Sequence, residues 1–210
     1  MSGGDCAGER ETEAELYRSA RRAARARPPA LSSFLPSLPP FPTHSARSKR
    51  LLGIKNVDVY ALGLYVDPAA VKKVAAGKKA VDDALLAAVV GDAVPKTLRV
   101  VVTTGLMTRT RFLASVRETL APALTKAGDP TAMDSFEALF ASTEFRKGTD
   151  LAFSNVPGGG MAVQAGGREL GRLASKAFAP AFFDLYLGKE PVSVEGKKSM
   201  VAGLAGLVAE

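Results

Sequence analysis

The sequence predicts an α+β fold, in which an antiparallel sheet carries its helices on one face. Residues 57–66 and 97–104 have the apolar, β-branched character of strands, and residues 149–165 are typical of a hairpin around a Pro- and Gly-rich turn. The helical patterns come in groups between and after these strands, without strict alternation. This order disfavours a parallel dinucleotide-binding sheet.

Length and composition indicate one domain of ordinary size with an N-terminal appendage. The chain has 210 residues, of which 47% are hydrophobic and 23% charged. The stretch "RPPALSSFLPSLPPFPT" has too many prolines for a helix interior or a central strand. We therefore assign residues 1–45 to a basic, Pro-rich extension and residues 46–210 to the domain.

The extension holds much of the net charge of +7, in Arg- and Ala-rich sequence typical of an organelle transit peptide. This favours a chloroplast location. Acidic residues between Asp5 and Glu15 do not fit such a peptide, so a flexible extension of a cytoplasmic protein is the alternative. Basic and aromatic residues are not interleaved elsewhere, which disfavours nucleic-acid binding.

The first half of the domain predicts two strands and two helices. One strand reaches about Gly53, and a second runs from Val57 to Val66. Asp67 and Pro68 mark a helix start, and that helix ends before Gly77. The apolar stripe of the next helix consists of Val81, Leu85, Ala88 and Val89.

The second half follows the strand at 97–104 with helices and the hairpin. A helix begins at Thr108 or Thr110, and Pro122 is expected to bend or split it. Its inward residues are Phe112, Leu113, Val116, Leu120 and Leu124. A helix follows within residues 129–142, with Met133, Phe136, Leu139 and Phe140 on one side. After the hairpin, we expect a long helix from about residue 168 to Gly188, and a last helix over 197–208.

Several classes of chemistry are disfavoured. Cys6 and His44 are the single cysteine and histidine, which argues against a disulfide, a metal cluster or a histidine-dependent triad. The glycines of "PGGGMAVQAGG" fit no phosphate-binding motif. We expect no metal, no cofactor, no membrane span and no identifiable catalytic residue.

The strand at 57–66 has two nearly apolar faces, which suggests that one covers a core and the other floors a ligand cleft. Tyr60 lies on the more apolar face, and Arg47 precedes the strand. A guanidinium and a phenol at the end of an apolar tunnel suit a carboxylate, while the walls hold its hydrocarbon chain. The alternative is that Arg47 belongs to the basic tail and Tyr60 is an ordinary strand residue.

Three segments resemble the chalcone isomerase family, most closely its chalcone-isomerase-like and plastid fatty-acid-binding branch. They are "KNVDVYALGLYVD", "KTLRVVVTTGLMTRTRFLASVRETLAPAL" and "GRLASKAFAPAFFDLYLGKEPVS". The resemblance covers the chain from about Arg47 onward and implies an open-faced β-sandwich with a cleft between sheet and helices. The family's first strands do not match this chain, so either N-terminal strands are missing or the given start of the gene is wrong.

The resemblance also implies roles for individual residues. In the fatty-acid-binding branch, the positions of Arg47 and Tyr60 hold the carboxylate. True isomerases carry a tyrosine and an asparagine where this chain has Phe112 and Thr119, which favours binding over catalysis. The expected lining of the cleft is Leu62, Leu64, Phe112, Val116, Thr119, Phe136, Phe140 and Phe178, most of which suit a core equally well.

The leading hypothesis is therefore a non-enzymatic binder of free fatty acids in plastid metabolism. One alternative is a chalcone isomerase, an intramolecular lyase of flavonoid biosynthesis. Another is a non-catalytic helper that binds enzymes of the flavonoid pathway.

Overall fold

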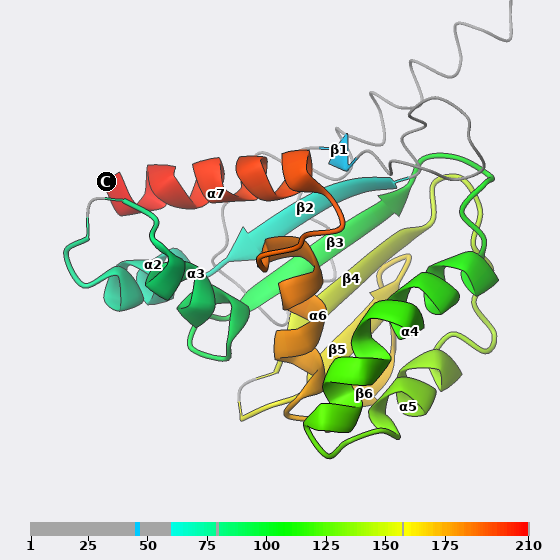
Figure 1. Cartoon of the computed structure of the whole chain (residues 1–210). Helices are drawn as coiled ribbons and strands as arrows, with labels where there is room; N and C mark the ends of the chain where they lie inside the picture. Colours follow the sequence, from blue (N-terminus) through cyan, green and yellow to red (C-terminus); the bar gives the residue numbers. More distant parts are fainter. Residues whose placement is uncertain (1–44, 47–59, 79, 157, 210) are drawn as a thin grey trace, which may run out of the picture.

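The computed structural model describes residues 45–46, 60–78, 80–156 and 158–209, and these form a single antiparallel sheet with helices against it (Figure 1). The strands follow one another across the sheet in chain order, each antiparallel to the next. They are β1 (Ser45–Ala46), β2 (Tyr60–Val66), β3 (Lys96–Val102), β4 (Asp150–Asn155), β5 (Met161–Ala165) and β6 (Arg168–Leu173). The predicted α+β class is confirmed.

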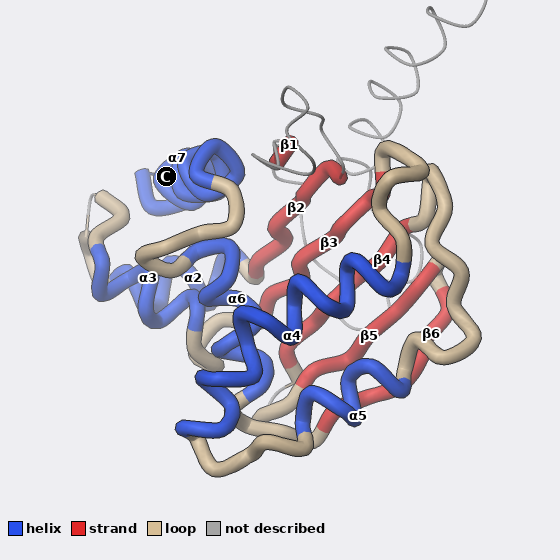
Figure 2. Tube along the Cα trace, turned by 45° about the vertical axis from the view of Figure 1, so that its right-hand side comes forward, coloured by secondary structure: helices blue, strands red, loops and turns tan. Residues whose placement is uncertain are grey.

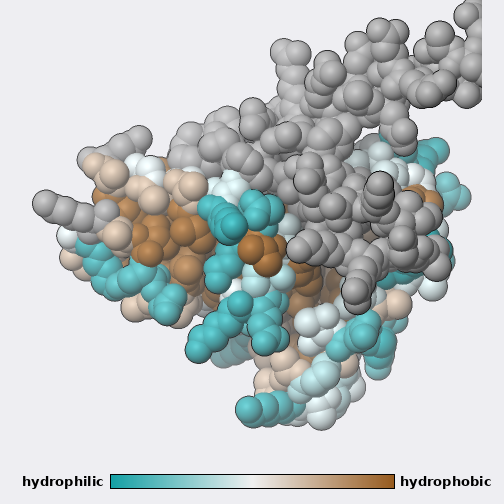
Figure 3. Space-filling model, turned by 45° about the horizontal axis from the view of Figure 1, so that its top comes forward, coloured by the Kyte–Doolittle hydropathy of each residue, from teal (hydrophilic) through white to brown (hydrophobic). Residues whose placement is uncertain are grey.

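The helices gather on one side of this sheet, and α4, α5 and α6 lie in front of it in both ribbon views (Figures 1 and 2). The described helices are α2 (Pro68–Ala75), α3 (Asp83–Val90), α4 (Arg109–Lys126), α5 (Ala132–Ala138), α6 (Phe178–Leu187) and α7 (Val194–Ala209). Figure 3 shows apolar residues gathered over α7. None of the described helices is long and apolar enough to cross a membrane.

The two faces of β2 differ from the prediction. Tyr60 and Leu62 point toward the helices, and that one face both joins the core and reaches the candidate pocket described below. The opposite face carries Tyr65 beside a polar pair, in which Arg99 donates two hydrogen bonds to the Asp150 carboxylate, at 2.8 and 2.6 Å. Core and pocket therefore share one face of the strand.

Aromatic rings fill the space between the sheet and α4, α5 and α6. Ring centroids lie 4.6 Å apart for Phe153 and Phe182, and 4.8 Å apart for Phe136 and Phe178. Each ring removes a large apolar area from water, and contacts of this kind add about 0.5–1.5 kcal/mol beyond burial. The rings in mutual contact are Phe112, Phe136, Phe140, Phe145, Phe153, Phe178, Phe182, Phe183 and Tyr186.

The predicted start of the first helix is confirmed in detail. The Asp67 carboxylate accepts hydrogen bonds from the backbone N–H groups of Ala69 and Ala70, at 2.9 and 3.2 Å. Pro68 occupies the first helical position, where its missing N–H costs nothing.

Of the two outcomes expected at Pro122, a bend or a split, the split does not occur, because helix α4 continues past this residue. Pro122 and Glu118, whose carbonyl would have accepted the missing hydrogen bond, both face solvent. Water can satisfy that carbonyl, and Leu120 and Leu124 remain buried on either side of the proline. Burial of the apolar stripe therefore holds the helix together.

The long helix expected from residue 168 was also wrong at its start. Residues 168–173 form β6, and the helix begins only at Phe178. Ala165 pairs with Arg168 across Gly166 and Gly167, whose φ angles of 55° and 81° are those of a tight two-residue hairpin turn. A second hairpin therefore extends the predicted one. The last helix likewise starts at Val194, three residues before the predicted position.

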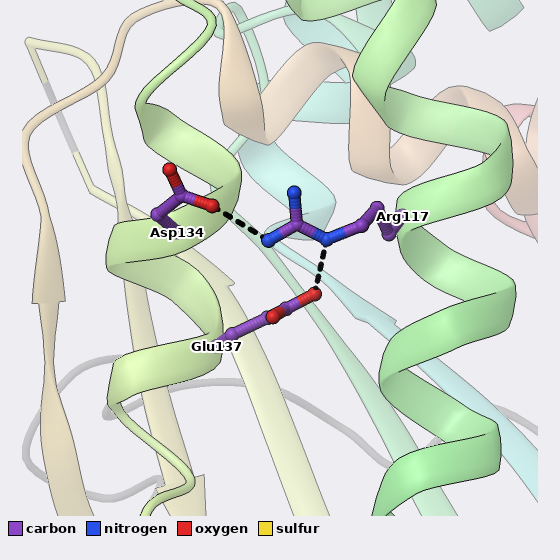
Figure 4. A network of polar contacts seen from close by, with 3 residues as sticks. All are labelled: Arg117, Asp134 and Glu137. Carbon is purple, nitrogen blue, oxygen red and sulfur yellow. Dashed lines mark hydrogen bonds and ion pairs between the residues drawn. The ribbon is translucent and has the colours of Figure 1, made fainter.

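An ion-pair network joins α4 to α5 (Figure 4). Arg117 on α4 donates to Glu137 and to Asp134, both at 2.6 Å. Asp134 and Glu137 are one turn apart on α5, so a single guanidinium bridges both.

The first predicted strand, up to Gly53, and residues 57–59 of the second lie outside the described residues.

Candidate binding site

A pocket lies where β2 begins, against α4 and the end of α6. Its volume is about 140 Å³. Pockets that enclose a whole drug-sized ligand usually measure about 300–1,000 Å³, so this one encloses a smaller group or part of a longer one. Its lining residues are Tyr60, Leu106, Met107, Arg111, Phe112, Ser115, Val116, Thr119, Leu185, Tyr186 and Val192.

Helix α4 supplies one wall through two neighbouring stripes. Arg111, Ser115 and Thr119 recur every four residues and therefore lie along one line of the helix surface. Phe112 and Val116 lie beside them and are 5% and 4% exposed. The wall thus changes from apolar at the core to polar at the surface.

Two tyrosines face the pocket from β2 and α6. Burial raises the pKa of Tyr60 to about 12. Burial, and then the nearby Tyr60, raise the pKa of Tyr186 well above its ordinary value. Both phenols are therefore neutral at physiological pH, and each offers one O–H donor without adding a negative charge.

Arg111 brings the positive charge. Its guanidinium donates a hydrogen bond to the backbone oxygen of Leu106, at 2.9 Å. The described residues of the pocket wall include no carboxylate. The lining therefore has one cation, two neutral phenols, the hydroxyls of Ser115 and Thr119 and an otherwise apolar remainder, which together suit the anionic end of an apolar molecule.

The mouth of the pocket is apolar as well. Leu106 and Val192 line it, and they are 44% and 41% exposed. Exposed large aliphatic side chains on both sides of an opening provide a surface for hydrocarbon that extends beyond the pocket.

The structure brings together only part of the predicted site. Tyr60, Phe112, Val116 and Thr119 line the pocket. Arg47 lies outside the described residues. The remaining predicted lining residues are packed in the core and do not reach the pocket wall, because ring and methyl contacts fill the space around them: Leu62, Leu64, Phe136, Phe140 and Phe178.

Sequence reasoning missed Arg111, Ser115 and Tyr186. For the two α4 residues, a signal was available, since the four-residue spacing to Thr119 places all three on one stripe. Tyr186 gave no such signal, because its approach to Tyr60 depends on how α6 packs against the sheet.

Two other hollows carry less specific chemistry. One between α3 and α6, of about 330 Å³, is lined by two aspartates and two lysines, whose charges balance. The other, of about 510 Å³ at the start of α4, has a mainly polar lining. No group of His, Cys, Asp or Glu suited to a metal ion occurs within the described part of the chain.

Comparison with known proteins places these observations in a family. A family model described as chalcone isomerase-like matches residues 53–202. A crystal structure of an Arabidopsis thaliana fatty-acid-binding protein superposes with a TM-score of 0.69 at 25% identity, over 79% of this chain and 88% of that one.

Two curated relatives are also named fatty-acid-binding proteins. Fatty-acid-binding protein 1 of Arabidopsis thaliana is 27% identical over 77% of this chain, and fatty-acid-binding protein 2 of the same organism is 28% identical over 78%. The matches span 62% and 44% of the lengths of these two relatives.

Proposed function

Because the chain belongs to the chalcone isomerase-like family, we propose that it binds a free fatty acid, or a similar small apolar acid, without converting it chemically. The observation that carries this proposal is the pocket beside Tyr60, where one cation and two neutral phenols border an apolar wall. The names of the curated relatives support the same ligand class.

In this proposal, Tyr60 and Arg47 hold the carboxylate. The Tyr60 phenol stays neutral and donates a hydrogen bond to a carboxylate oxygen. A guanidinium presents two parallel N–H groups to the same carboxylate, which is the role that the family resemblance implies for Arg47. Hydrogen bonds to a charged group contribute about 1.5–3 kcal/mol each.

The apolar wall binds the hydrocarbon chain. Phe112, Val116 and Leu185 remove methylene groups from water, and each buried methylene contributes about 0.8 kcal/mol. Beyond the enclosed volume, the chain crosses the aliphatic mouth formed by Leu106 and Val192. The hydrocarbon thus supplies much of the affinity, and the polar groups orient the acid.

The test is calorimetric titration of the delipidated full chain with decanoic acid, together with mass spectrometry of any lipid that co-purifies. We expect saturable binding of one acid per chain, weakened about tenfold in Tyr60→Phe by loss of one hydrogen bond to a charged group. Val194→Ala is a control, since that exposed residue does not line the pocket. Absence of uptake by the wild-type chain would overturn the proposal.

A chalcone assay tests the non-catalytic part of the proposal. Phe112 has no hydroxyl and Thr119 no carboxamide, so the wall lacks the groups that the family resemblance assigns to the isomerases at these positions. We expect chalcone to disappear no faster with the protein than in buffer.

We further propose a plastid as the compartment, and fatty-acid metabolism there as the context. The Arg- and Ala-rich sequence of the N-terminal extension supports this. A fluorescent fusion to residues 1–45 should enter plastids, and diffuse cytoplasmic fluorescence would contradict the assignment.

A further inference from the structure

We propose that Arg111 binds the carboxylate of the ligand in the pocket that it lines together with Tyr60, and that it makes this site selective for acids over uncharged lipids of the same length. This inference rests on the proposed fatty-acid binding. It adds a head-group ligand on α4 to the Tyr60 phenol on β2.

Arg111 lies at the edge of the pocket. It lies in the first turns of α4, one residue before Phe112, whose ring forms part of the apolar wall. Ser115 and Thr119 continue the same stripe along the pocket. A side chain at this place borders both the enclosed volume and the solvent, which is where the charged end of an amphiphile is least costly to place.

The guanidinium of Arg111 is anchored by a hydrogen bond to the backbone. Its hydrogen bond to the Leu106 oxygen holds the side chain against the loop before α4. A guanidinium has five N–H donors, so others remain for a carboxylate after this bond is made. A side chain already held in place loses less conformational entropy when the ligand binds.

Arg111 supplies the positive charge of the pocket lining. Arg111 is the one formally charged residue among the described residues that line the pocket. By contrast, Arg117 on the same helix pairs with Asp134 and Glu137, and Arg99 pairs with Asp150. Among the described residues, no acid pairs with Arg111 in this way, which favours an incoming carboxylate as its ionic partner.

The neighbouring phenols complete the recognition. Tyr60 and Tyr186 lie on the same pocket wall, and burial keeps both protonated. Each phenol is both a donor and an acceptor and can therefore bond to a hydroxyl or an ester as well as to a carboxylate, although the bond to the carboxylate is stronger. The Arg111 guanidinium adds an ionic interaction that only the acid can form, and it therefore increases the discrimination between an acid and an alcohol.

The experiment compares decanoic acid with decanol on the full chain by competition calorimetry. In Arg111→Gln we expect decanoate to bind about tenfold more weakly and decanol to bind as it does to the wild type. Arg111→Lys should restore part of the loss, because it keeps the charge but not the fork. The matched control is Arg146→Gln, which removes an equal charge at an exposed position away from the pocket.

The outcomes separate this inference from the proposed function. If the wild-type chain takes up no decanoate, the proposed function itself fails. If the wild type binds decanoate and Arg111→Gln binds it equally well, only the role of Arg111 is overturned. Equal weakening of acid and alcohol would also overturn it, since that result indicates a change in the shape of the pocket and not a lost charge interaction.

Discussion

Lys96 is an unusual residue for the interior of a sheet, because its side chain is 1% exposed and carries an amine. The ammonium group donates to the backbone oxygens of Gly91 and Val94 and lies 4.5 Å from the centre of the Phe183 ring. Burial lowers its pKa from 10.5 to about 8, although the charge of Asp92 partly opposes this. The protonated form is therefore less stable in the folded chain than in the unfolded one.

This residue predicts a stability that increases with pH. Between pH 8 and pH 10.5, the unfolded chain keeps the Lys96 proton that the folded chain has lost, so the free energy of unfolding rises as pH rises. The pKa shift corresponds to about 2–4 kcal/mol across the window. Urea unfolding of the wild type and of Lys96→Met at several pH values measures this increase. Between pH 8 and pH 10.5, the free energy of unfolding should rise by this amount less in the variant than in the wild type. Parallel curves for the two proteins would contradict the burial of a charged amine.

The effect of Lys96 is the difference between the free energies of unfolding of the wild type and of Lys96→Met at each pH. The buried tyrosines Tyr60 and Tyr186 have raised pKa values, so deprotonation of the unfolded chain near and above pH 10 lowers stability in both. This contribution is common to both proteins and cancels.

At the scale of single residues, sequence could identify a side chain with a local signature but not one defined by its neighbours. Tyr60 stood out as a phenol in an apolar strand face, and the structure places it at a pocket. Phe136 and Phe178 are inward-facing aromatic residues, as cleft residues often are. Their rings nevertheless pack against each other, with centroids 4.8 Å apart. An aromatic residue on an inward face fits a core and a cleft equally well, and only the packing of the other elements decides.

At the scale of elements, most helices and strands were predictable because their apolar periodicity and caps are local. The exception was β6, whose Arg, Glu and Leu residues favour a helix by propensity. Its pairing with β5 overrides that preference, and β6 is an edge strand whose residues are exposed or half-exposed except for the buried Leu173. The two glycines at 166–167 were the overlooked signal.

The turn between β4 and β5 yields a prediction at this scale. Gly160 has φ of 113°, and a Cβ atom there would lie 2.3 Å from the backbone oxygen of Leu173. Gly160→Ala should therefore lower the free energy of unfolding by at least about 2 kcal/mol, through backbone strain and displacement of β6. Thermal and urea unfolding provide the measurement.

Gly158→Ala is the matched control for this turn. Gly158 also has a positive φ, of 87°, but a Cβ atom added there would meet nothing within 4 Å, so only the backbone preference is lost. We expect a cost of about 1 kcal/mol there. If both alanine variants lost the same stability, the close approach of β6 to the turn would not be what makes Gly160 necessary.

At the scale of the whole molecule, the packing of the helical layer decides where a ligand can go. The rings beneath α4, α5 and α6 occupy the centre of the space between sheet and helices, while the pocket lies at its edge beside Tyr60. A sequence cannot reveal this division, since it depends on the summed volumes of side chains from distant elements. Within the described part of the chain, this packing places the proposed ligand at the edge that the start of β2 shares with α4 and the end of α6.

This confinement predicts a limit to the gain from longer acyl chains. Affinity should rise by about 0.8 kcal/mol for each methylene that enters the enclosed volume, and by less once about 140 Å³ is filled and the chain lies on the exposed mouth. Calorimetric titration with a series of saturated acids measures the gain for each added methylene. Val116→Ala enlarges the pocket and should move the levelling-off to a longer acid. A constant gain up to the longest acid would instead indicate a fully enclosing tunnel, because only a chain buried along its whole length contributes equally at every carbon.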